Sequence, residues 1–265
     1  MISIILILLF VFSVLSVPVC HGVISGLYLY GMKIFPGLFI SFILTNILVR
    51  ILQQKNINNP WILVITGLMT GFPNGAYICS WYNKNNPENR LGDMLAGIIN
   101  IPSPAFLISY VYINILEKCI SLPMFLALTY TPVILCSYMA ILFFRDKDNK
   151  KDNAPHIKND KKLIFHFFEE AVDSSINTAL TLGAYVIIFS VIVNIIMHFS
   201  QSNTAGLLIS YLFEISNGLA IIKNAGIPMN ITVLLTVLLD AFGGVCIIMQ
   251  TKSICSSYIS IKKYI

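Results

Sequence analysis

Charge is scarce in this chain. Asp, Glu, Lys and Arg make up 11% of its 265 residues, whereas 57% are hydrophobic and the mean hydropathy is +0.80. Such a composition excludes an ordinary soluble domain. Outside the polar stretch Arg145–Lys162, the apolar segments are about 15 to 23 residues long, which is the length that crosses a hydrocarbon core of roughly 30 Å. We therefore predict an all-α polytopic membrane protein with about six to eight membrane segments.

Motifs for catalysis and for metal binding are absent as well. The six Cys form no C-x-x-C pair, the four His lack metal-ligand spacing, and there is no G-x-S-x-G, H-E-x-x-H or phosphate-loop motif. We expect no enzyme, no cofactor and no metal site. The Cys are interpreted as small apolar residues in a lipid bilayer.

The few charges gather in one segment. Seven Lys and Arg residues lie within Arg145–Lys162, and the bias of basic residues toward the cytoplasmic side predicts a cytoplasmic loop. Asp residues are interspersed among them, so no nucleic-acid partner is expected. The loop divides the chain into a first membrane half, 1–144, the loop itself, 145–162, and a second membrane half, 163–265.

The sequence also predicts two helix ends and one interfacial segment. Met1–Val19 lacks a basic leader and a convincing cleavage site, which favours a first membrane helix, ended by His21 and Gly22, over a cleaved signal. Pro36 is predicted at the start of the second helix, where its missing N–H costs nothing. The amphipathic segment Leu163–Asp173 is predicted to lie at the membrane interface.

Glycine, proline and polar residues interrupt the apolar segments at four places. The interruptions are Thr70–Gly75, Asn100–Pro104, Glu214–Gly218 and Asp240–Gly244. Pro removes a helical donor and Gly lowers helix propensity, so a continuous helix is not expected there. In a membrane such breaks occur where protein or a water-filled cavity satisfies the freed backbone groups, and transporters build substrate sites from them. We predict a re-entrant hairpin or two half-helices over Trp61–Tyr82, with a kinked straight span as the alternative.

Two interruptions precede the charged loop and two follow it. Paired interruptions in two halves are typical of a repeat-built transporter with a site near the midplane. The apparent order of elements differs between the halves, so two pseudo-repeats remain one interpretation.

The new helix ends at these breaks predict a binding site. Backbone N–H groups at a helix N-terminus favour an anion, and Gly lets a solute approach the backbone. Close helix packing is the alternative explanation for each Gly. We expect a small polar or anionic solute. The candidate substrate-binding residues are Thr70, Gly71, Pro73, Asn74, Gly75, Asn100, Ser103, Asn217, Gly243 and Gly244.

Glu214 and Asp240 are the acidic residues embedded in apolar segments of the second half. A carboxylate inside a membrane is costly unless it is paired or protonated, which makes both residues candidates for ion or proton coupling. The alternative is structural: each carboxylate caps the N-terminus of the half-helix that follows it.

The motif residues resemble a known family. The matching runs are Thr70–Ala76, Asn100–Phe106, Glu214–Gly218 and Phe242–Gln250. They are similar to the YlbJ-type sporulation integral membrane proteins, within the wider group of nucleoside-recognition gate-domain proteins. The resemblance implies a bacterial membrane protein that moves dipicolinic acid across the outer forespore membrane during sporulation. A nucleoside transporter and a non-transporting scaffold or assembly factor are the alternatives, and the expected partners are the lipid bilayer, a small anion such as dipicolinate, and further copies of the chain in a homo-oligomer.

Overall fold

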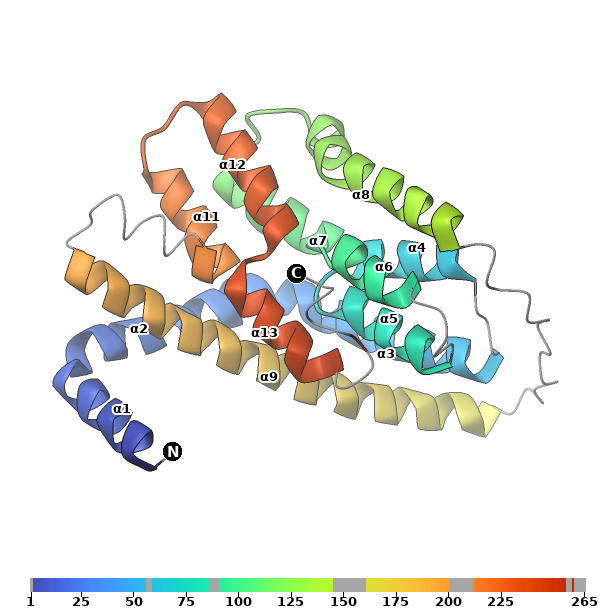
Figure 1. Ribbon diagram of the computed structural model, residues 1–265, viewed down its shortest axis with the longest axis horizontal. Coiled ribbons are helices and arrows are strands. Elements are labelled where there is room, and N and C mark those ends of the chain that lie inside the picture. Colours follow the sequence, from blue (N-terminus) through green and yellow to red (C-terminus); the bar gives the residue numbers. More distant parts are fainter. Residues whose placement is uncertain are drawn as a thin grey trace.

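The computed structural model describes residues 2–55, 59–85, 91–144, 161–200, 212–255 and 259. Within these ranges every regular element is a helix (Figure 1). The first half contains α1 (Ile2–Val14), α2 (Ser16–Tyr28), the π-helix η1 (Leu29–Ile34), α3 (Phe35–Lys55), α4 (Pro60–Thr70), α5 (Asn74–Asn85), α6 (Leu91–Ile99), α7 (Pro104–Phe106), the π-helix η2 (Leu107–Ile115) and α8 (Leu122–Phe144). The second half contains α9 (Lys161–Ser200), α11 (Ile215–Asn224), α12 (Met229–Phe242) and α13 (Gly244–Cys255). The predicted cytoplasmic loop lies outside the described residues, except for Lys161 and Lys162, which begin α9.

Five helical runs in the described ranges are long and apolar enough to cross a membrane. They are Ser16–Leu52, Leu91–Ile115, Leu122–Phe144, Phe168–Ser200 and Met229–Cys255. The chain is therefore an all-α polytopic membrane protein, as its composition predicts. The predicted count of six to eight segments also included the broken segment Trp61–Tyr82, whose helices α4 and α5 have 11 and 12 residues. Each is about 18 Å long or less, too short to cross alone.

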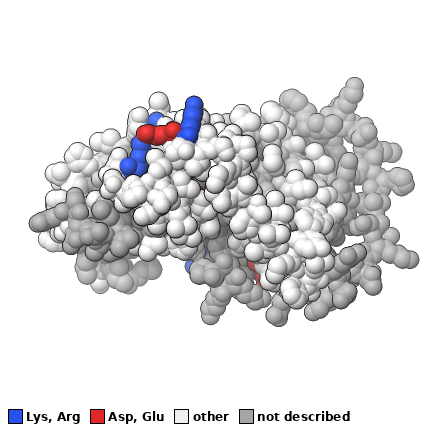
Figure 2. Space-filling view, turned by 90° about the horizontal axis from the view of Figure 1, so that it is seen from above, with Lys and Arg blue, Asp and Glu red and all other residues white. Residues whose placement is uncertain are grey.

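The outer surface of the helices is apolar. Phe143 is 80% exposed, Leu180 68% and Phe199 67%, whereas side chains of this size are normally buried in a soluble protein. Figure 2 shows only a small group of charged side chains among the described residues on one face. Such a surface suits contact with the hydrocarbon of a bilayer.

The first long run is continuous, which corrects two expected helix ends. α2, η1 and α3 follow one another without a gap. The helical run therefore continues through both His21-Gly22 and Pro36. At the end of η1 the Phe35 N–H donates to the Tyr30 carbonyl, five residues back. The missing N–H of Pro36 therefore falls where the π-helix returns to α-helical bonding, a place where a helix tolerates a lost donor.

Gly22 is a packing residue and not a helix end. With Gly26 it forms a small-x-x-x-small face on α2, which lies against α9. A Cβ on Gly22 would lie 2.5 Å from Val191 Cα, and one on Gly26 would lie 2.8 Å from Ile187 Cα. The two backbones approach each other closely because neither Gly carries a side chain.

α9 runs the length of the molecule beside α2 and α3 (Figure 1). The segment Leu163–Asp173, predicted to lie at the membrane interface, belongs to the first part of this 40-residue helix. Polar contacts join α9 to α3: Arg50 pairs with Glu170, and Asn46 Nδ2 donates to Ser175 Oγ at 2.9 Å. The interfacial position of the segment stays a prediction.

The described elements of the two halves differ in order, as the sequence predicts, because α4 and α8 of the first half have no counterpart among the described elements of the second. Both halves nevertheless contain a short helix that begins at a break (α5 or α11), followed by a broken long helix (α6 to η2, or α12 to α13). The short helix of each half packs against the second part of the broken helix of the other half: α5 on α13, and α11 on η2. This reciprocal packing is what two related halves would produce.

Candidate functional site

All four predicted interruptions are breaks in the helices. The chain leaves helical structure at Gly71–Pro73, Asn100–Ser103, Glu214 and Gly243. Trp61–Tyr82 forms two half-helices that pack on each other, so the kinked straight span does not occur. The Phe72–Pro73 peptide bond is cis. New helix N-termini are produced at Asn74, Pro104, Ile215 and Gly244.

The first two breaks are joined to each other. The Phe72 N–H donates to the Ile101 carbonyl at 2.9 Å, which satisfies backbone groups that the break frees. Gly71, at φ 70°, lies against the next turn so closely that a Cβ would be 2.3 Å from Ser103 N. The loops therefore form one unit near the middle of the protein.

Asn100 connects this unit to the second half. Its Oδ1 accepts from the Ala76 N–H at 3.3 Å, while its Nδ2 donates to Thr251 Oγ1 of α13 at 3.0 Å. Tyr110 makes the reciprocal connection, since its hydroxyl donates to the Ser216 carbonyl of α11 at 3.0 Å. These two hydrogen bonds join the breaks of one half to helices of the other.

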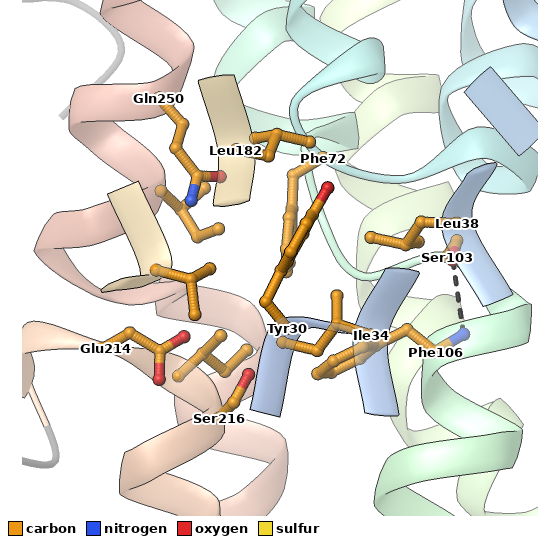
Figure 3. A pocket seen from close by; sticks show the side chains of 13 residues that line it. Tyr30, Ile34, Leu38, Phe72, Ser103, Phe106, Leu182, Glu214, Ser216 and Gln250 are labelled. Carbon is orange, nitrogen blue, oxygen red and sulfur yellow. Dashed lines mark hydrogen bonds between the residues drawn. The ribbon is translucent and has the colours of Figure 1, made fainter. Parts of the chain in front are cut away.

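A buried cavity of about 30 Å³ lies where the breaks converge, with room for about two water molecules. Its lining comes from η1, α3, α9, α11, α13 and the first two breaks: Tyr30, Ile34, Leu38, Phe72, Ser103, Phe106, Leu182, Val186, Glu214, Ile215, Ser216, Ile247 and Gln250. In Figure 3 the Tyr30 ring stands in the middle, with Glu214 and Gln250 on one side and Ser103 on the other. The site combines aromatic surface with polar groups from both halves.

Glu214 is the charged residue in this lining. It is 1% exposed, and its Oε2 accepts from the Asn217 N–H at 2.6 Å, as an N-cap of α11. The predicted capping role is confirmed, and the same carboxylate also faces the cavity. The lining contains no Lys or Arg. The cavity therefore offers a carboxylate, an amide, hydroxyls and aromatic faces to a solute, and no cationic side chain.

Of the predicted site residues, Ser103 and Glu214 line the cavity. Ser103 Oγ also accepts from the Phe106 N–H at 3.3 Å and so caps α7. The remaining candidates form or brace the breaks and do not line the cavity: Thr70, Gly71, Pro73, Asn74, Gly75, Asn100, Asn217, Gly243 and Gly244. Thr70 donates to the Thr66 carbonyl, and Asn217 Nδ2 donates to Ser190 Oγ of α9.

The glycines among these candidates serve close packing. A Cβ on Gly75 would lie 2.7 Å from the Ile99 carbonyl oxygen, and one on Gly244 would lie 3.2 Å from that of Leu212. Gly243, in the left-handed conformation, ends α12. Asn74 is 4% exposed, and its Nδ2 has no acceptor among the residues that the structure describes.

Sequence reasoning missed most of the lining. Tyr30, Phe106, Ser216 and Gln250 were not among the candidates, and Phe72 was noted only within its motif. Phe72 and Phe106 lie inside the matching runs, so the motifs did carry a signal for them. Nothing marked Tyr30, because it lies outside the four predicted interruptions.

Asp240 occupies a different place from Glu214. It lies within α12, two residues before the helix ends, and is not an N-cap, so the capping explanation is wrong for this residue. It does not line the cavity. Its side chain is nevertheless almost fully buried, at 1% exposure.

Together, these features define a polytopic membrane protein with four helix breaks, three of which contribute Phe72, Ser103 and Glu214 to the lining of a cavity. No protein-family model, no curated protein and no solved structure matches the chain.

Proposed function

We propose that this protein transports a small polar solute across a membrane, with the cavity beside the first three breaks as its binding site. One observation carries the proposal: breaks from both halves contribute to the lining of a cavity that is both polar and aromatic. Broken membrane helices expose backbone groups and hinge points at the depth where a transported solute has to be held. A protein with only a structural role has no need of them.

The lining favours a solute that combines a ring with polar groups. Phe72, Phe106 and Tyr30 present aromatic surface for a planar ring, while Glu214 and Gln250 offer hydrogen-bond partners at its edge. A cavity of about 30 Å³ is too small for such a ring, so binding requires the breaks to open. Dipicolinate and nucleosides both combine a ring with polar groups. Dipicolinate would place its carboxylates beside the Ser103 hydroxyl, away from Glu214.

The resemblance to sporulation membrane proteins supports dipicolinate as the first solute to test. It also supports the outer forespore membrane of a spore-forming bacterium as the location. A fluorescent fusion followed during sporulation tests that location directly, and uniform labelling of the cell membrane in non-sporulating cells would contradict it.

Ligand-induced stabilisation of the purified protein tests the transport site. Dipicolinate, nucleosides and other small dicarboxylates are added to the protein in detergent, because a solute that binds only the folded form raises stability by about 2.7 kcal/mol at one hundred times its Kd. A responding solute should lose most of this effect in Gln250→Leu and Ser103→Ala. Ser109→Ala, which removes an exposed hydroxyl on η2, is the matched control and should respond like the wild type.

Uptake into proteoliposomes with the same variants completes the test. The proposal requires that the solute that stabilises the protein is also taken up, and that both effects fall together in Gln250→Leu. Equal responses in the cavity variants and in Ser109→Ala would refute the cavity as the site. A protein without any ligand response, but with a stable co-purifying partner, would favour the membrane scaffold.

A further inference from the structure

Asp240 is a buried acid whose carboxyl group forms no hydrogen bond with any residue that the structure describes. It is 1% exposed, and neither Oδ1 nor Oδ2 has a partner within the described part of the chain. Thr236, one turn earlier on the same face of α12, is 0% exposed, and its Oγ1 also lacks a partner there. Buried polar groups are nearly always paired, so two unpaired groups side by side on one helix face require an explanation.

No described neighbour supplies a positive charge to Asp240. α12 packs against α8 and α11 and continues into α13. α8 carries Tyr130 and no charged residue. α11 carries Glu214 at its N-terminus and Lys223 near its C-terminus, but the Lys223 ammonium is engaged by Glu117. α13 carries Cys246 and, in its last turn, the exposed Lys252. An ionised carboxylate in such surroundings would be unpaired inside the membrane, which is strongly unfavourable, whereas a carboxylic acid is tolerated.

Tyr130 lies on the helix that joins α12 to the breaks. α8, which carries Tyr130, packs against α12, which carries Asp240. The Tyr130 hydroxyl donates at 3.2 Å to the carbonyl of Pro102. Pro102 lies in the second break and immediately precedes Ser103, which lines the cavity. An anionic Asp240 would attract this hydroxyl proton and so compete with the Pro102 carbonyl for it.

We propose that Asp240 is the proton-binding residue of the transporter, and that its ionisation shifts the Tyr130 hydroxyl from Pro102 and so alters the break beside the cavity. The proton comes from the aqueous phase, forms an O–H bond on Asp240 and is released to water on the other side. The coupling to solute movement rests on the transport function proposed above.

Infrared spectroscopy of the membrane-reconstituted protein tests the proton site without any solute. At neutral pH the wild type should show the carbonyl stretch of a protonated carboxylic acid, part of which is lost in Asp240→Asn. Asp173→Asn removes the same group from an exposed position on α9 and should leave the band unchanged. An identical band in Asp240→Asn and in the wild type would overturn the proposal, because Asp240 would then be ionised.

Solute flux separates this proposal from the proposed function. In proteoliposomes, Asp240→Asn should retain solute exchange in the absence of a gradient but lose accumulation driven by a pH gradient. Tyr130→Phe should behave in the same way while keeping the infrared band. Exchange together with normal gradient-driven accumulation in Asp240→Asn would refute proton coupling while leaving transport intact. Absence of exchange in the wild type would instead refute the transport function.

Discussion

Gly71→Ala should strongly destabilise the protein, because two separate effects meet at this position. Its φ of 70° and ψ of −171° lie in a region that is essentially restricted to glycine, and a residue with a side chain there costs about 1–3 kcal/mol. The new Cβ would also lie 2.3 Å from Ser103 N and 2.8 Å from Ser103 Cα. Because these are backbone atoms, the contact cannot be relieved by a side-chain rotation, and overpacking of this kind costs about 1–3 kcal/mol.

The expected loss in the free energy of unfolding is therefore about 2–6 kcal/mol. Two matched glycines separate the contributions. Gly226 has φ 65° but open space around its Cβ position, so Gly226→Ala should cost only the strain, about 1–2 kcal/mol. Gly31, with nothing within 4 Å of that position and no positive φ, should tolerate Ala without loss.

Equilibrium unfolding in mixed micelles of a mild detergent and dodecyl sulfate measures these differences. The fluorescence of Trp61 and Trp81 reports on the transition, since both flank the α4–α5 break. The order of destabilisation should be Gly71→Ala, then Gly226→Ala, then Gly31→Ala. Equal effects of Gly71→Ala and Gly226→Ala would show that the close approach to Ser103 does not exist in the folded protein, and the packing of the first two breaks would have to be revised.

Three further predictions concern other parts of the fold. Gly26→Leu should separate α2 from α9 and cost about 1–3 kcal/mol in the same unfolding assay, whereas Gly31→Leu should not; equal losses would argue against the close helix contact. The Lys223 ammonium, 2.7 Å from Glu117, lowers the pKa of Glu117 through its hydrogen bond and its charge, so the stabilisation from this pair should be present at neutral pH and be lost as the pH falls through the lowered pKa. Lys223→Met should raise the Glu117 pKa in an NMR titration, and an unchanged titration would show that the pair does not form. Ser137 is 0% exposed, and its hydroxyl has no partner among the described residues, so Ser137→Ala should be neutral or stabilising by up to about 1 kcal/mol; a clear loss of stability would reveal a hydrogen bond there.

The helix breaks were predictable because their causes are local. A Pro or a Gly weakens the helix wherever it stands, and the capping preference of a carboxylate likewise depends on a few neighbouring residues, as at Glu214. Where a local rule failed, a tertiary contact had overridden it. Gly22 packs against α9 instead of ending a helix, and Pro36 is accommodated by the change from π- to α-helical bonding.

The cavity lining was much less predictable than the breaks. Ser103 and Glu214 were identified because each stands at a break, while Gln250 and Tyr30 reach the cavity from within continuous helices. In a membrane protein the side of a helix that faces lipid and the side that faces the interior can both be apolar. Hydrophobic periodicity therefore does not reveal which face of η1 or α13 points inward.

The sequence by itself determined the membrane character, the all-helical structure and the positions of the four interruptions, because composition and backbone chemistry act over a few residues. Only the tertiary structure decided which breaks meet and which carboxylate faces the cavity. Asn100 reaches Thr251, and Tyr110 reaches Ser216, across more than one hundred positions of the chain. Such contacts depend on how the two halves pack together, and that packing separates Glu214, at the cavity, from Asp240, which is buried away from it.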